Sequence, residues 1–75
     1  MSKRQKLFER LMSGVADADI AFEDLCRILL ALGFDRRMRG DHHIFTRQDL
    51  QEILNLQPKG AQAKPYQVKQ VRAII

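Results

Sequence analysis

The chain has 75 residues, 45% of them hydrophobic, a net charge of +4 and a single cysteine. A chain of this length forms one small domain with little room for a deep pocket, and one cysteine excludes both an internal disulfide and a thiolate-rich metal site. No apolar stretch follows the charged start as in a signal peptide, and none is long enough to span a membrane, so we expect a soluble cytoplasmic protein.

The first part of the sequence predicts two helices. Residues 3–12 can form a short helix that ends at Ser13-Gly14, and the small, polar residues 15–19 are typical of a connector. A second helix is predicted over residues 22–32, with Gly33 as its stop. Its apolar residues recur on one helical face: Phe22, Leu25, Leu29 and Leu32.

After Gly33 the apolar period changes to that of short strands. Segments 34–39, 42–47 and 53–57 each have strand length, and Arg39-Gly40-Asp41 predicts the turn of a hairpin between the first two. In the third segment Leu54 and Leu56 alternate with polar residues, which predicts one buried and one solvated face.

A last helix is predicted to begin at Pro65, because proline suits the first position of a helix. Val68, Val71 and Ile75 share one of its faces. The order α-α-β-β-β-α predicts an α+β fold, a three-stranded antiparallel sheet with helices on one face and solvent on the other. We expect a single domain over residues 1–75, with an N-terminal helix and connector (1–19) added to a core (20–75).

The positive charge is unevenly placed. Residues 1–52 carry nine Lys or Arg and nine Asp or Glu, whereas residues 53–75 carry four basic residues and no acidic one. This excess favours a polyanion or an acidic protein as partner, although a merely solvated basic helix stays possible. Lys59 and Lys64 flank the start of the last helix, where free N–H groups can bind a phosphate. Tyr66 could stack on a base or pack under the loop.

The segment Gly40-Asp-His-His-Ile-Phe45 is the strongest functional signal. Neighbouring residues of a strand face opposite ways, so if Phe45 enters the core, His43 points inward and His42 outward. An outward histidine beside a basic segment suits proton transfer at a phosphodiester, although His42 could also be only a polar surface residue. The diverging histidines and an inward Cys26 support neither a zinc site nor a Cys–His nucleophile.

The same segment resembles the Gly-Ser-His-x-x-Phe/Tyr motif of the HicA toxins. Asn55-Leu-Gln-Pro-Lys-Gly60 and Lys64-Pro-Tyr-Gln-Val-Lys-Gln-Val-Arg72 are similar to the second half of one HicA-like subgroup. The resemblance implies a fold like that of a double-stranded-RNA-binding domain, α-β-β-β-α, here with an extra N-terminal helix. It also implies an mRNA-cleaving toxin that a HicB antitoxin silences, and it assigns catalysis to His42 and not to His43.

The resemblance therefore predicts an endoribonuclease that needs no metal and no cofactor. Its expected partners are mRNA and a HicB-like antitoxin, with no membrane association and no DNA contact by the toxin itself. The residues expected to bind RNA are Arg39, Lys59, Lys64, Lys69 and Tyr66.

Asp41 departs from the motif, which usually has serine there. A carboxylate beside His42 stabilises a charged imidazole and repels a phosphate, so Asp41 is expected to tune the site. Two alternatives remain open at this point: a noncatalytic RNA-binding module of the same fold, and an interaction module whose basic face binds an acidic protein.

Overall fold

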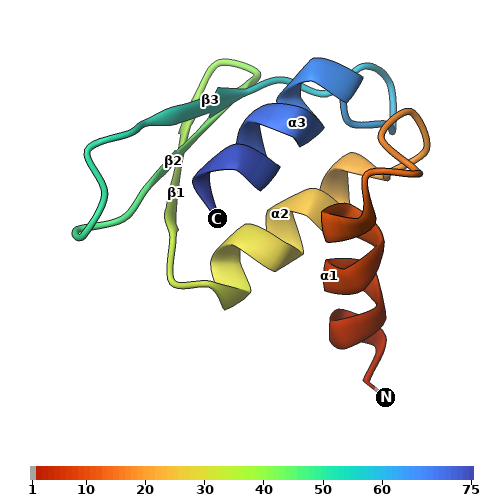
Figure 1. The fold of residues 1–75 in the computed structure, drawn as a ribbon. Helices are drawn as coiled ribbons and strands as arrows, with labels where there is room; N and C mark the ends of the chain where they lie inside the picture. The colour runs from red at the N-terminus through yellow and green to blue at the C-terminus, as the bar shows by residue number, and fades with distance from the viewer. Residues whose placement is uncertain (1) are drawn as a thin grey trace.

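The structure, a computed structural model, describes residues 2–75. Its elements in chain order are α1 (Lys3–Ser13), α2 (Phe22–Ala31), β1 (Asp35–Arg39), β2 (His42–Thr46), β3 (Leu54–Leu56) and α3 (Pro65–Ile74). The three strands form one antiparallel sheet in the order β1-β2-β3, and α2 and α3 lie on the same side of it (Figure 1). The predicted α+β architecture is confirmed. Among the described residues, no helix has the length and apolar character needed to cross a membrane.

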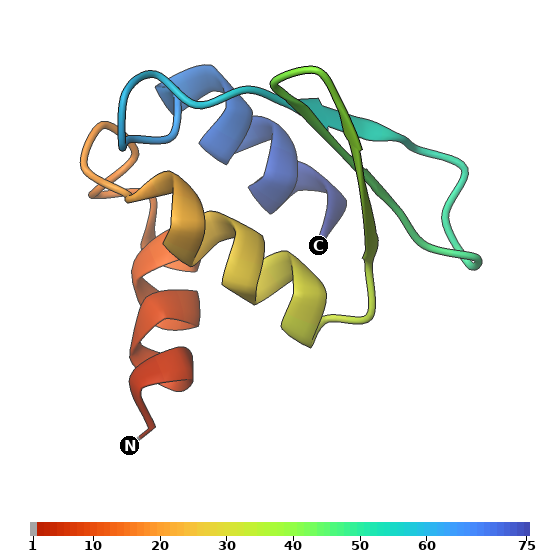
Figure 2. The same cartoon turned by 180° about the vertical axis from the view of Figure 1, so that it is seen from behind.

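Helix α1 lies apart from the sheet and packs against α2 and α3 (Figure 2). The Ser2 side chain caps its start by accepting a hydrogen bond from the Gln5 backbone N–H at 3.1 Å. Its end is set by Gly14, whose φ of 76° is the left-handed conformation that glycine adopts without a steric penalty. Leu11 is the one fully buried residue of α1, whereas Phe8 and Met12 stay largely exposed.

One hydrophobic core joins the helices to the inner face of the sheet. α2 contributes more buried residues to it than any other element, because its apolar residues follow the helical period and form one continuous stripe. Each fully buried leucine in such a core contributes about 1.5–3 kcal/mol relative to an exposed one. The completely buried large side chains are Leu11, Leu25, Leu29, Phe45, Leu54, Leu56, Val68 and Val71.

The register of the sheet decides which side chains share a face. Across the strands, Met38 pairs with His43 and His43 with Leu56, which places these residues on the inner side. The alternate row faces solvent, and its pairs are Arg37 with Ile44, Arg39 with His42 and Ile44 with Asn55.

The first two predicted strands are each one residue longer than the observed ones at the end near α2. Phe34 is buried and precedes β1, and Arg47 follows β2. The Arg47 guanidinium donates a hydrogen bond to the Leu32 carbonyl at 2.9 Å and lies 4.9 Å from the centre of the Phe34 ring. This arginine therefore closes the C-terminal end of α2 instead of extending the sheet.

Candidate active site

The two adjacent histidines of β2 point to opposite sides of the sheet, as their alternation predicted. The His42 side chain faces solvent on the open side and is 47% exposed. His43 faces the core, where its ring packs edge-on against Phe22 with the ring centres 4.7 Å apart. No described residue forms a hydrogen bond with the buried Nδ1 of His43. Of the two histidines, His42 is therefore the one that can contact a large ligand on the open face.

Asn55 of β3 holds the His42 ring. The side-chain oxygen Oδ1 of Asn55 lies 2.8 Å from Nδ1 of His42, a normal hydrogen-bond length. Asn55 pairs with Ile44 in the register, so its side chain reaches diagonally along the open face towards His42. The sequence placed Asn55 on the solvated side of its strand but did not indicate a functional role. The alternation of β3, which predicts that Asn55 faces solvent on the same side of the sheet as His42, is the one sequence feature that could have pointed to it.

Asp41 stands at the other nitrogen of the same ring. Its Oδ1 atom lies 3.8 Å from Nε2 of His42, and its Oδ2 atom accepts a hydrogen bond from the Gln57 side chain. That hydrogen bond is the main cause that lowers the pKa of the Asp41 carboxyl below its ordinary value, and the charges of His42 and Lys64 lower it further. The carboxylate is therefore ionised at neutral pH, beside the exposed nitrogen of His42.

Helix α3 fixes the position of Gln57 through Gln67, which is buried. With its amide oriented to satisfy both contacts, Gln67 donates to the Gln57 carbonyl at 3.0 Å and accepts from the Gln57 N–H at 3.2 Å. The backbone after β3 is thereby tied to α3, and the Gln57 side chain is free to hold Asp41. A helix under the sheet thus determines where a charge on the open face lies.

The loop between β3 and α3 is anchored at the start of α2. The Ala63 N–H donates to the Ile20 carbonyl at 2.8 Å, and the Phe22 N–H donates to the Ala61 carbonyl at 3.0 Å. These bonds hold the segment that carries Lys59 and Lys64 without using either lysine side chain. A basic loop with a fixed backbone can present its charges at a defined place.

The predicted RNA-binding residues fall into two groups. Arg39 pairs directly with His42 across the hairpin, and the charge of Lys64 helps to lower the pKa of Asp41, the neighbour of His42. Lys59 is exposed in the loop, and Tyr66, on the first turn of α3, is 63% exposed. Lys69 differs, because its charge acts on Asp17 in the connector after α1.

Arg72, one of the four basic residues of segment 53–75, forms an ion pair within the protein and is not available to bind RNA. Its guanidinium forms two hydrogen bonds with the Asp17 carboxylate, at 2.7 and 2.9 Å, and one with the Leu11 carbonyl at 3.0 Å. The charge excess of residues 53–75 is correct as counted, but the charge of Arg72 is paired with an acidic residue. Its acidic partner lies 55 positions earlier in the sequence, which net charge by segment does not reveal.

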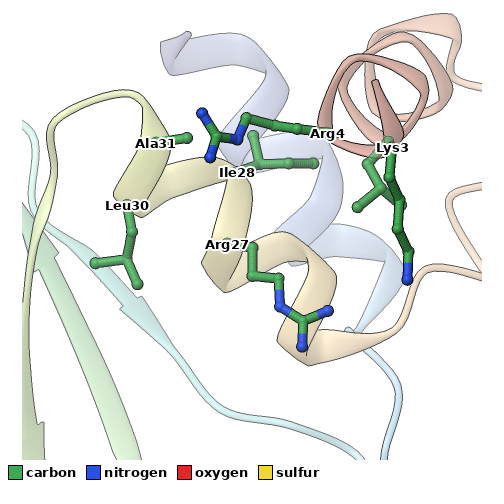
Figure 3. Close-up of a pocket in the computed structure, with 7 residues that line it drawn as sticks. Lys3, Arg4, Arg27, Ile28, Leu30 and Ala31 are labelled. Carbon is green, nitrogen blue, oxygen red and sulfur yellow. The ribbon is translucent and has the colours of Figure 1, made fainter. Parts of the chain in front are cut away.

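His42 is absent from the linings of two surface hollows. One, of about 550 Å³, lies between α1 and the second half of α2, and no strand residue lines it (Figure 3). The other, of about 520 Å³, lies along the β1–β2 hairpin and is lined by Arg37, Met38, Arg39, Ile44, Thr46 and Ile53. The second hollow extends the His42 surface towards two arginines.

Residues 2–75 contain no cluster of three His, Cys, Asp or Glu side chains placed to hold a metal ion. Cys26 is buried in α2, and this burial raises the pKa of its thiol above the ordinary value. A raised pKa keeps the thiol protonated at neutral pH, so Cys26 is poorly suited to act as a nucleophile.

The comparison with protein families gives a match over most of the chain. A family model described as "HicA toxin of bacterial toxin-antitoxin" matches residues 22–74, which span α2, the sheet and α3 and leave α1 outside. The comparisons with curated proteins and with solved structures found no match.

Proposed function

Because the chain belongs to the HicA family of toxins from bacterial toxin–antitoxin systems, we propose that it is an endoribonuclease that cleaves mRNA without a metal ion, with His42 as its catalytic residue. A toxin of this kind meets its mRNA in the cytoplasm. A HicB-like antitoxin that covers the open face of the sheet would silence it.

The observation that carries the proposal is the environment of His42. Its ring lies on a solvated sheet face, and its Nδ1 is hydrogen-bonded to Asn55. Nε2 forms no hydrogen bond with any described residue, and the Asp41 carboxylate lies 3.8 Å from it. Arg39 supplies positive charge opposite His42 in the sheet, and the charge of Lys64 acts on the neighbouring Asp41. A histidine that is oriented, exposed and next to cations can exchange a proton with a bound phosphodiester.

The reaction that fits these groups uses the RNA as its own nucleophile. The 2′-oxygen forms a bond to the adjacent phosphorus while the bond from phosphorus to the 5′-oxygen breaks. The 2′-hydroxyl loses a proton and the 5′-oxygen gains one, so the products are a 2′,3′-cyclic phosphate and a 5′-hydroxyl. His42 serves one of these two proton transfers, and solvent at the open face can serve the other.

The surrounding cations hold the substrate. Lys59, Lys64, Arg39 and the N–H groups at the start of α3 contact phosphates, and Tyr66 offers an exposed ring for a base. Such contacts read the shape and charge of RNA more than its sequence. The alternative from a different class, a noncatalytic RNA-binding module, is favoured by one observation: the Asp41 carboxylate lies where a phosphate has to approach Nε2.

The test is cleavage of a defined RNA by the purified protein, with and without EDTA. We expect cleavage in both conditions, a cyclic phosphate at the new 3′ end, and no cleavage when the attacking 2′-hydroxyl is replaced by hydrogen. Activity lost in EDTA and restored by a divalent metal would contradict metal independence. Binding without cleavage under all conditions would favour the RNA-binding module.

A further inference from the structure

The contact between His42 and Asn55 determines which nitrogen of the ring is available. A neutral imidazole has one N–H and one lone pair, and the nitrogen that donates to an acceptor carries the hydrogen. Nδ1 lies 2.8 Å from the Asn55 oxygen, whereas Nε2 lies 3.8 Å from the Asp41 carboxylate. The first distance is a hydrogen bond and the second is too long for one.

We propose that Asn55 is a positioning residue: its side-chain oxygen accepts the Nδ1–H of His42, so that Nε2 is the nitrogen that exchanges protons with the RNA. This inference rests on the proposed function for its catalytic part, whereas the tautomer stands or falls by itself. The effect of Asn55 is indirect, because its amide touches the ring and not the reacting atoms.

The opposite tautomer has a specific structural requirement. The Asn55 amide would have to turn so that its NH₂ group donates to Nδ1, and the hydrogen on Nε2 would point to Asp41. In that arrangement the short contact would persist with donor and acceptor reversed, but the structure places the Asn55 oxygen, and not its NH₂ group, 2.8 Å from Nδ1. The geometry therefore favours the hydrogen on Nδ1.

The pair keeps its bond through the reaction. As a base, the lone pair of Nε2 takes the proton of the 2′-hydroxyl while the bond from oxygen to phosphorus forms. As an acid, Nε2–H gives its proton to the 5′-oxygen while the bond from phosphorus to that oxygen breaks. In both directions Nδ1–H stays on the Asn55 oxygen, so the ring does not have to turn between the two states.

Two substitutions at Asn55 separate the hydrogen bond from simple packing. Asn55 is exposed, so neither variant should alter the fold, and thermal midpoints provide the check. Asn55→Ala removes the acceptor, and we expect kcat to fall by about 10- to 100-fold with little change in KM. Asn55→Asp keeps an acceptor but cannot donate, so kcat should stay within a few-fold of the natural protein while the added negative charge raises KM.

A second readout does not depend on activity. The ¹⁵N NMR shifts of the neutral His42 ring should show hydrogen on Nδ1 in the natural protein and in Asn55→Asp, and a mixture of tautomers in Asn55→Ala. Hydrogen on Nε2 in the natural protein, or unchanged kcat and tautomer in Asn55→Ala, would overturn the proposal. If the natural protein shows hydrogen on Nδ1 and yet cleaves no RNA, the endoribonuclease function fails, and the catalytic role of Asn55 with it, while the hydrogen bond stands.

Discussion

Arg72 of α3 binds Asp17 of the connector after α1, through two hydrogen bonds of 2.7 and 2.9 Å between partly buried side chains. The same guanidinium bonds the Leu11 carbonyl near the end of α1. It also lies about 3.6–3.7 Å from where a Cβ on Gly14 would sit. One side chain therefore attaches the N-terminal helix, which lies outside the family match, to the core.

This ion pair makes stability depend on pH. The hydrogen bond from Arg72 is the largest cause that lowers the pKa of Asp17 below its ordinary value. A lowered pKa in the folded state stabilises the protein above the unfolded value of about 3.9, and this contribution is lost as the pH falls through the folded value. Asp17→Asn should thus lower the thermal midpoint at about pH 7 and have a progressively smaller effect below about pH 4.

The matched control is Asp19→Asn, because Asp19 forms an ion pair with Arg10 in which the side chains are 78% and 48% exposed. Exposed pairs contribute little to stability, so this variant should change the midpoint much less. If Asp17→Asn has the same effect at both pH values, the pair does not titrate as argued.

Substitution of His42 should remove activity and leave the fold intact. The ring is half-exposed and makes little packing contact, so His42→Ala should change the free energy of unfolding by no more than about 0.5 kcal/mol. Loss of a group that transfers protons typically lowers the rate by roughly 10²- to 10⁴-fold. RNA cleavage and thermal unfolding of the same preparation measure both effects. Full activity in a folded His42→Ala variant would refute the assignment.

His43→Phe is the sharpest control for that experiment. It keeps an aromatic ring against Phe22 and removes the buried Nδ1, which has no hydrogen-bond partner among the described residues. Removal of an unsatisfied buried polar atom does not weaken a core, so stability should be equal or higher and cleavage should persist. Loss of cleavage in a stable His43→Phe variant would mean that the inner histidine also contributes to the reaction.

The basic loop is tested by the salt dependence of RNA binding. Replacement of Lys59 and Lys64 with alanine should weaken binding and reduce the slope of log K against log salt by roughly one for each phosphate that the protein no longer neutralises. Lys69→Ala is the comparison, because the charge of Lys69 acts on Asp17 in the connector, whereas that of Lys64 acts on Asp41. An equal reduction of the slope in Lys69→Ala would extend the RNA surface along α3 to the connector.

The sequence predicted the elements well because each follows a local rule. Residues close in the sequence were enough to predict the helix α2, the glycines that end helices and the start of α3 at Pro65. The same holds for the strand alternation that places His42 and His43 on opposite faces. The contacts that complete the site depend on register instead. The link between β2 and β3 has no periodic pattern, so the sequence alone did not predict that Asn55 would lie beside His42 or Gln57 beside Asp41.

The effect of Asp41 on RNA binding provides the last prediction. Asp41→Ser introduces the residue usual in the motif and removes a carboxylate 3.8 Å from Nε2 of His42. RNA should bind a few-fold more tightly at low salt, and this gain should shrink as salt screens the repulsion that the natural protein retains.

The pH range of that gain follows from the lowered pKa of Asp41, whose main cause is the hydrogen bond from Gln57. The carboxylate stays ionised well above its pKa, so the gain should be constant between about pH 5 and 8. Asp41→Asn separates charge from shape, because an amide of the same size can still accept the Gln57 hydrogen bond. If charge is the cause, both variants bind RNA more tightly than the natural protein. If only the serine variant does, the repulsion argument fails, and the small hydroxyl side chain itself is what the RNA requires at this position.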